Sequence, residues 1–272
     1  MTQQKTADAR LAERLTAIAI EASTAILAVD FRHAGTRRKA DHSPVTKADD
    51  AAQSVIQAGL ALLLPGTPVM SEEAMLAWRE PPREFLLVDP LDGTAEFLTG
   101  RLEYTVNIAL VRDGAPVAGI VAAPALGLIW RGATDHGAER LRFAPGASAT
   151  APAEKIHTRA WPADERVAAV SRSHFDPASA AFLERVAPVR SLACGSALKF
   201  CRLAEGAIDV YPRLAPTSEW DVAAGHAVVA AAGGAVLAPD GGALRYGCAN
   251  EGCRVPGFIA WGDPAAARRF AT

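Results

Sequence analysis

Two aspartates three residues apart, Asp89 and Asp92, stand in an Asp-Pro-Leu-Asp-Gly-Thr run that directly follows the apolar segment Phe85–Val88. We expect the apolar segment to be a buried strand and the run to be a turn. Carboxylates held this close repel each other, and a Mg²⁺ ion between them reverses that repulsion because it binds oxygen ligands in near-octahedral geometry. Backbone N–H groups of Gly93 and Thr94, at a predicted helix start, can bind a phosphate. The pattern therefore predicts metal-assisted phosphoryl chemistry.

Further carboxylates stand at the ends of predicted elements. Glu72 follows an apolar strand, Asp49 lies in the first turn of a predicted helix, and Asp221 starts another helix. With the first two aspartates they could converge on two or three Mg²⁺ ions, and the Leu91 carbonyl could be a further ligand. Each acid also has an ordinary explanation, since helix N-terminal acids are stabilised by the dipole and Glu72 could be solvated. Those explanations leave the Asp-Pro-Leu-Asp-Gly-Thr run unaccounted for.

Basic residues that could hold an anion are scattered along the second half of the chain. Lys199, Arg213 and His174 lie near predicted strand or helix ends, and Ser196 directly precedes the helix that carries Lys199. Alone they are weak signals, because a single arginine after a strand is usually at the surface and a single histidine is usually structural.

Composition and charge limit the class of protein. The chain has 272 residues, half of them apolar, which is enough for one large domain or two smaller ones. Its 28 lysines and arginines nearly balance 30 acidic residues, for a formal net charge of −2. Binding to nucleic acid or to a membrane surface through overall charge is therefore not expected, whereas a small anionic ligand remains compatible.

Two absences bear on location. No run of about 18 apolar residues exists, so no integral membrane association is expected, and the polar stretch 1–14 lacks the apolar segment of a secretory signal. The cysteines Cys194, Cys201, Cys248 and Cys253 form no CxxC pair, which argues against zinc. We expect reduced thiols in a cytoplasmic protein, with a Cys248–Cys253 disulfide as the alternative.

The hydrophobic pattern predicts two halves that meet in the Pro/Gly/Ser/Ala-rich stretch 144–153. Residues 1–145 should form two helices, 6–29 and 47–63, and an antiparallel sheet, with Thr46 as the N-cap of the second helix and Asp49 at its capping-box position. Residues 146–272 should alternate strands and helices. The predicted strands are 69–70, 85–88, 104–111, 117–122, 128–131, 167–170, 189–192, 208–211, 235–237 and 258–261, and the later helices are 178–186, 196–205 and 219–232.

The whole chain resembles the inositol-monophosphatase-like superfamily of Mg²⁺-dependent, lithium-sensitive phosphatases. The resemblance rests on the run at 89–94, on Trp-Asp-Val-Ala-Ala-Gly at 220–225, and on Ser-Glu-Glu at 71–73. It implies an α/β fold with α+β layers, an alternating αβαβα sandwich of the sugar-phosphatase type.

Within that superfamily the chain looks most like the bacterial 3′(2′),5′-bisphosphate nucleotidases of the CysQ type. The segments that carry this narrower resemblance are 43–49, 104–110, 171–174, 195–201, 204–206 and 211–213. Lys47 stands where the family usually has a small residue, just upstream of Asp49 on a helix turn, and leaves the carboxylate itself in place. Lys39 resembles a basic residue on a loop over the metal site.

The resemblance implies a role for each matching residue. The implied metal ligands are Glu72, Asp89, the Leu91 carbonyl, Asp92 and Asp221, and the implied catalytic residues are Asp49, Thr94 and Glu72, with Asp49 and Thr94 positioning and deprotonating water. The residues implied to contact the substrate are Leu91, Gly93, Thr94, His174, Ser196, Lys199, Arg213 and Asp221.

The implied reaction is hydrolysis of the 3′-phosphate of adenosine 3′,5′-bisphosphate by direct attack of water, giving AMP and phosphate in support of sulfate assimilation. 3′-Phosphoadenylyl sulfate is a second expected substrate. The alternatives are an inositol monophosphatase, a fructose-1,6-bisphosphatase, an NADP phosphatase, or a non-catalytic metal- or nucleotide-binding regulator. We expect a monomer or homodimer, with loose association with the cytoplasmic face of the inner membrane left open.

Overall fold

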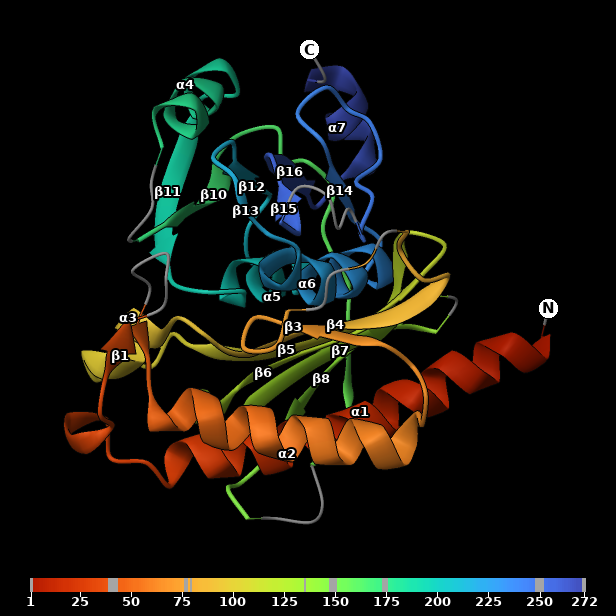
Figure 1. Ribbon diagram of the computed structural model, residues 1–272. Coiled ribbons are helices and arrows are strands. Elements are labelled where there is room, and N and C mark those ends of the chain that lie inside the picture. The colour runs from red at the N-terminus through yellow and green to blue at the C-terminus, as the bar shows by residue number, and fades with distance from the viewer. Residues whose placement is uncertain are drawn as a thin grey trace.

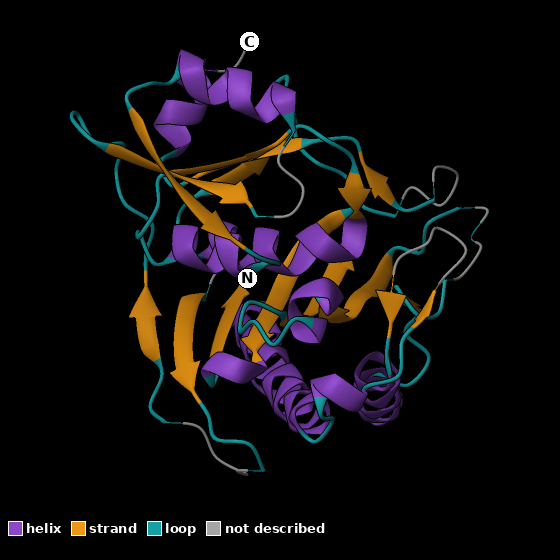
Figure 2. Cartoon of the chain, turned by 90° about the vertical axis from the view of Figure 1, so that its left-hand side faces the viewer, coloured by secondary structure: helices purple, strands orange, loops and turns teal. Residues whose placement is uncertain are grey.

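The computed structural model describes residues 2–38, 44–75, 78, 80–134, 136–146, 151–172, 176–247 and 252–270. Helices and sheets alternate in layers, from α1 and α2 at one side, through a larger sheet, the central helices α5 and α6, and a smaller sheet, to α4 and α7 (Figure 1). Figure 2, turned by 90°, shows the same succession. This arrangement confirms the predicted αβαβα sandwich.

Helices α1 to α6 lie near the predicted positions, with differences at most of their ends, whereas α7 was not predicted. Their bounds are α1 (Thr2–Leu27), α2 (Lys47–Leu63), α3 (Thr94–Leu98), α4 (Pro177–Arg185), α5 (Leu198–Ala204), α6 (Glu219–Ala231) and α7 (Pro264–Phe270), with short 3₁₀ turns η1 (Phe31–His33) and η2 (Pro124–Leu126). The predicted helix 6–29 ends earlier, at Leu27, because the chain turns so that Asp30 can cap η1 by accepting a hydrogen bond from the Arg32 N–H.

Among the described residues, seven strands form the larger sheet, in the order β3-β4-β5-β6-β7-β8-β9. The strands are β3 (Val69–Ser71), β4 (Glu84–Asp92), β5 (Thr105–Arg112), β6 (Ala115–Ala123), β7 (Leu128–Ala133), β8 (Gly137–Arg142) and β9 (Glu154–Ile156). The prediction of an antiparallel sheet is wrong for one pair, because β3 and β4 run parallel. β9 pairs with β8, so this sheet extends past residue 145. The division into 1–145 and 146–272 stays a prediction.

The smaller sheet has the order β11-β10-β12-β16-β14 among the described residues, with bounds β10 (Arg166–Ser171), β11 (Val189–Cys194), β12 (Val210–Arg213), β14 (Ala235–Leu237) and β16 (Phe258–Trp261). β10 is parallel to β11 and β12, while β16 is antiparallel to its neighbours. Short pairs join β1 (Arg37–Arg38) to β2 (Pro44–Val45) and β13 (Thr217–Ser218) to β15 (Arg254–Val255).

Helix α6 is the central element that positions the site. It is buried nearly all around, as its run of Ala and Val residues predicts. It packs directly on β5, β6 and β7 because glycines let the backbones approach. A Cβ on Gly119 would lie 2.4 Å from the Ala224 carbonyl oxygen, and one on Gly225 would lie 2.3 Å from the Phe200 ring. None of the described helices is both long and apolar enough to cross a membrane.

Candidate active site

A pocket of about 810 Å³ opens where the larger sheet, α3, α5 and the start of α6 meet. Its walls differ in charge. One wall carries the acidic side chains of Glu72, Asp89, Asp92 and Asp221. A second set of lining residues, Lys199 and Arg213, makes a cationic wall that lies close to Asp92. The fold therefore brings acidic and basic residues from distant parts of the sequence into one pocket. The two most distant acids, Glu72 and Asp221, are 149 positions apart in the sequence.

Two acids of the pocket, Asp89 and Asp92, have raised pKa values. Burial, followed by the charges of Glu72, Asp92 and Asp221, raises the pKa of Asp89 well above its ordinary value. Burial and the charge of Asp221 raise the pKa of Asp92 to about 7, although Lys199 acts in the opposite direction. A cation bound close to these side chains would favour their ionised forms. The donor set, all carboxylate oxygens, suits a hard ion such as Mg²⁺.

In the arrangement seen, no three His, Cys, Asp or Glu side chains among the described residues are gathered in a way that could hold a metal ion. The hydrogen bonds of the acids explain this. Asp92 Oδ2 accepts from the Ala197 N–H at 2.7 Å, and Asp221 accepts from the Thr217 hydroxyl. Asp89 Oδ1 accepts from the Leu91 N–H at 3.0 Å. Each of these three carboxylates thus accepts a hydrogen bond from a protein group.

The β4 strand positions the run at 89–94 differently from the predicted turn. The strand continues to Asp92, with an irregular register against β5 between Asp89 and Asp92. Gly93, at φ 92°, then reverses the chain into α3. The predicted helix start is present, but α3 spans only five residues, Thr94–Leu98, so its dipole contributes less than a full helix would.

Asp49 and Thr94 form the contact that the resemblance implied. Thr94 Oγ1 lies 3.1 Å from Asp49 Oδ1 and 3.1 Å from the Leu91 carbonyl oxygen, so its single proton can go to either. Asp49 is 1% exposed, and its Oδ2 accepts from the N–H and hydroxyl of Thr46 at 2.7 Å each. Burial raises the pKa of Asp49 despite these hydrogen bonds.

The residues on the cationic wall differ in how they are placed. Arg213 lines the pocket from the end of β12. Ser196 also lines it, and its buried hydroxyl has no hydrogen-bond partner among the described residues. Lys199 is 3% exposed, and its ammonium donates to the carbonyls of Cys194 at 3.2 Å and Ser196 at 2.6 Å. Lys199 is therefore mainly a structural cation in this arrangement.

Two predicted residues, His174 and Lys39, lie outside the described residues. The sequence did not single out Arg254, an exposed side chain that lines the pocket beside Ser218, its β15–β13 partner. An isolated arginine carries no spacing signal, so its position could be found only from the fold.

Comparison with known proteins identifies the family to which this layered fold belongs. The chain belongs to the inositol monophosphatase family, whose model matches residues 6–268. It is 40% identical over 223 residues to the 3′(2′),5′-bisphosphate nucleotidase CysQ of Salmonella typhimurium strain LT2, covering 81% of this chain and 86% of that protein. The corresponding protein of Escherichia coli K12 is 39% identical over 222 residues, with the same coverage.

Solved structures show the same likeness. The crystal structure of CysQ from Bacteroides thetaiotaomicron, a bacterial member of the inositol monophosphatase family, superposes with a TM-score of 0.77 at 34% identity, covering 93% of this chain and 97% of that one. An inositol monophosphatase from Zymomonas mobilis gives a TM-score of 0.75 at 28% identity, covering 98% and 96%.

Proposed function

We propose that this chain is a Mg²⁺-dependent phosphoric monoester hydrolase, a 3′(2′),5′-bisphosphate nucleotidase that converts adenosine 3′,5′-bisphosphate to AMP and phosphate. The observation that carries this is one pocket lined by both acidic and cationic side chains, in a chain about 40% identical to CysQ nucleotidases. A substrate with two phosphates needs both walls. The acids would serve the scissile phosphate, and Arg213 would serve the second phosphate, while Lys199 holds the loop beside it. 3′-Phosphoadenylyl sulfate would fit the same division.

Glu72, Asp89, Asp92, Asp221 and the Leu91 carbonyl would hold the metal. Bound Mg²⁺ would neutralise the phosphate charge and stabilise the leaving oxygen. The number of ions, two or three, is part of the proposal. The raised pKa values of Asp89 and Asp92 support it, because side chains that repel each other when bare are the ones that a divalent cation stabilises.

Thr94 and Asp49 would handle the attacking water. The Thr94 hydroxyl would donate a hydrogen bond to Asp49 Oδ1 and accept one from the attacking water. As the water attacks, its proton would pass to Thr94 while the Thr94 proton passes to Asp49. Burial makes Asp49 a stronger base than an exposed aspartate. As the water oxygen bonds to phosphorus, the ester P–O bond breaks, and the departing 3′-oxygen takes a proton from solvent. Gly93 and Thr94 would contact the phosphate with their N–H groups.

A substrate panel tests this proposal. Phosphate release should be fastest with adenosine 3′,5′-bisphosphate and should require Mg²⁺. One charge-assisted contact to the second phosphate is worth about 1.5–3 kcal/mol, so inositol 1-phosphate should react roughly tenfold more slowly or worse. Fructose 1,6-bisphosphate and NADP belong in the same panel. Equal rates with inositol phosphate and the nucleotide would rule out the nucleotidase assignment.

An Asp92→Ala variant separates the enzyme from a non-catalytic regulator. Loss of this acid should lower kcat by about a hundredfold or more, because it removes charge stabilisation at the reacting phosphate. The matched control is Asp164→Ala, which removes an exposed aspartate away from this pocket. Lithium, similar in radius to Mg²⁺ with half the charge, should inhibit at millimolar concentration. Full activity in the Asp92 variant would contradict the metal assignment.

A further inference from the structure

The loop from Ala193 to Ala197 forms part of the cationic wall, and its conformation is strained. Ser196 has φ 45°, in the left-handed region that non-glycine residues seldom adopt. Its hydroxyl is buried and without a partner among the described residues, although it lines the pocket. A strained backbone and an unpaired buried hydroxyl both persist only when the surroundings hold them. The question is which side chains hold this loop.

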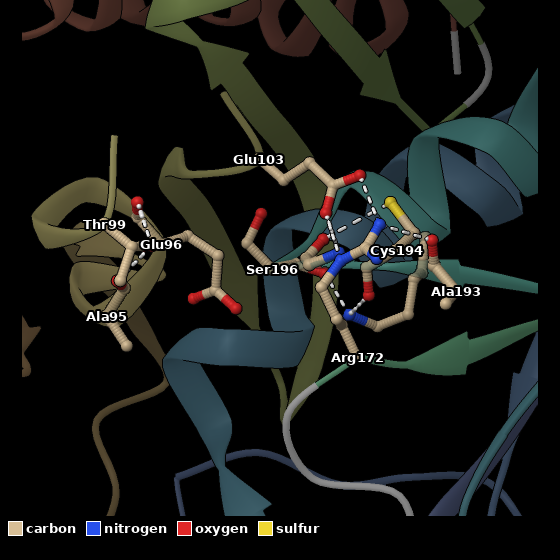
Figure 3. A network of polar contacts seen from close by, with 10 residues as sticks. Ala95, Glu96, Thr99, Glu103, Arg172, Ala193, Cys194 and Ser196 are labelled. Carbon is tan, nitrogen blue, oxygen red and sulfur yellow. Dashed lines mark hydrogen bonds and ion pairs between the residues drawn. The ribbon is translucent and has the colours of Figure 1, made fainter. Parts of the chain in front are cut away.

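Glu103, from the segment just before β5, binds the loop from the larger sheet. Its Oε2 accepts from the Gly195 N–H at 3.0 Å. Both of its carboxylate oxygens also accept from Arg172, at 2.9 Å each, and Arg172 donates to the Ala193 carbonyl at 2.9 Å. Figure 3 shows Glu103 meeting Arg172 beside the Cys194–Ser196 segment. The ion pair is therefore hydrogen-bonded to the loop at two positions, through Arg172 to Ala193 and through Glu103 to Gly195.

Two further charged side chains hold the rest of the loop. Lys199 donates to the carbonyls of Cys194 and Ser196, and Asp92 accepts from the Ala197 N–H. Charged side chains thus hold three peptide groups of the loop, 193–194, 194–195 and 196–197. The glycine is required, because a Cβ on Gly195 would lie 2.8 Å from the Glu103 carbonyl oxygen.

The ion pair is poorly placed to stabilise the fold as such. The side chains of Arg172 and Glu103 are 35% and 28% exposed, and pairs this exposed add little to stability. Their geometry, however, is bidentate and extends to main-chain groups of the loop, which fixes direction. The hydrogen bonds from Arg172 and Gly195 hold the pKa of Glu103 below its usual value although burial opposes them, so the carboxylate is ionised at neutral pH.

We propose that Glu103 is a positioning residue that, through Arg172 and the Gly195 N–H, orients the Ser196 hydroxyl toward the nucleotide part of the substrate. The inference rests on the proposed nucleotidase function and deepens it, because it identifies the residues that hold the Ser196 part of the pocket in place. Glu103 does not touch the reacting phosphate. Its loss should therefore weaken substrate binding more than it slows the chemical step.

Steady-state kinetics of three variants test this. Glu103→Ala removes both the ion pair and the acceptor for Gly195, whereas Glu103→Gln keeps an acceptor oxygen but loses the charge. The control is Arg83→Ala, which breaks an exposed arginine–aspartate pair with Asp113 at 3.0 Å elsewhere. Adenosine 3′,5′-bisphosphate reports on both walls, and p-nitrophenyl phosphate, which lacks a nucleoside, reports on the acidic wall.

For adenosine 3′,5′-bisphosphate we expect KM to rise about tenfold in Glu103→Ala, with kcat within about twofold, since small misplacements of binding groups carry costs of this size or greater. Glu103→Gln should lie between Glu103→Ala and the wild type. Kinetics with p-nitrophenyl phosphate, and all kinetics of Arg83→Ala, should be unchanged. An unchanged KM, or an equal loss of kcat with both substrates, would overturn the inference.

Amide hydrogen exchange gives a readout that needs no substrate. Exchange in the peptide covering 193–200 should accelerate in Glu103→Ala and stay at the wild-type rate in Arg83→Ala. Unaltered exchange in Glu103→Ala overturns the inference whatever the enzyme hydrolyses. Accelerated exchange supports the role of Glu103 even if the wild-type protein does not hydrolyse adenosine 3′,5′-bisphosphate. Lack of hydrolysis would then overturn only the proposed function.

Discussion

Two carboxylates in this protein, Asp49 and Asp221, both cap a helix and take part in the candidate site. Asp49 closes the capping box of α2 with Oδ2 and holds Thr94 with Oδ1, and Asp221 caps α6 while it lines the pocket. The sequence presents helix capping and site chemistry as rival explanations of these acids. The structure shows that they coexist, because a carboxylate has two oxygens and can serve each purpose with one of them.

At the residue scale, the acidic residues were easier to predict than the cationic ones. Asp89 and Asp92 are marked by their spacing in one short run. The family resemblance implied that Lys199 contacts the substrate. Its ammonium, however, donates to two main-chain carbonyls. Arg254 reaches the pocket through pairing of β15 with β13, which no local pattern reveals.

Arg254 yields a prediction. It lines the pocket and forms no ion pair with any other described residue, so its charge is available to an anionic ligand. Arg254→Ala should raise KM for adenosine 3′,5′-bisphosphate roughly tenfold, the low end for a charge-assisted hydrogen bond. KM for adenosine 3′-monophosphate, which lacks the second phosphate, should change little. The matched control is Arg190→Ala, on the exposed strand β11. Parallel losses with both nucleotides would refute this role.

His226 yields a prediction on pH. It is partly buried on α6, its Nδ1 lies 2.9 Å from the Tyr246 hydroxyl, and burial lowers its pKa to about 4. The unfolded chain then binds more protons than the folded one as pH falls from about 6.5 to 4. Stability should therefore drop across that window, by up to about 3 kcal/mol at 1.36 kcal/mol per pKa unit.

Urea unfolding at pH 7 and pH 4.5 measures the effect of His226. The His226→Gln variant keeps a polar partner for Tyr246 but cannot be protonated, so it should lose less stability than the wild type. Buried Glu219, whose charge raises the pKa of Tyr246, is present in both proteins and cancels in the comparison. The same pH dependence in both proteins would show that His226 is not responsible.

At the scale of elements, local signals predicted where most helices and strands lie, but few of their ends. Helix 47–63 with its Thr46 cap, and the strands 235–237 and 258–261, match the structure at both ends. Caps, breakers and alternation act within a few residues, so the sequence displays them. The parallel β3–β4 pair and the addition of β9 to the first sheet are long-range outcomes. They depend on packing between distant segments, which short patterns do not encode.

The contact of α6 with the larger sheet is the element-scale feature most sensitive to mutation. Gly119→Ala would place a Cβ 2.4 Å from the main-chain oxygen of Ala224, so the helix would have to shift. We expect a loss of about 1–3 kcal/mol in unfolding free energy, typical of overpacking. Because Asp221 sits on the first turn of α6, activity should fall too. Gly242→Ala, at an exposed turn, is the control for glycine replacement. Wild-type stability in Gly119→Ala would show that the interface yields easily.

At the scale of the molecule, the pocket joins the two predicted halves. Asp92 and Glu103 from the first half accept from Ala197 and Gly195 of the second, and the core of buried side chains runs from the larger sheet through α6 into the smaller one. The hydrophobic pattern predicted two halves. The shared core indicates that they should unfold together.

Calorimetry with Mg²⁺ tests this unity and the metal site together. We expect one transition whose midpoint rises as Mg²⁺ is added, because ligands contributed by β4 and α6 are drawn together by the ion. At a hundredfold excess over Kd the gain is about 2.7 kcal/mol, which corresponds to roughly 5 °C or more for a chain of this size. Asp221→Asn should show a much smaller rise, since it removes the charge supplied by the second half. Two transitions, with only one of them responding to Mg²⁺, would mean that the halves are independent and that the first half binds the ion alone.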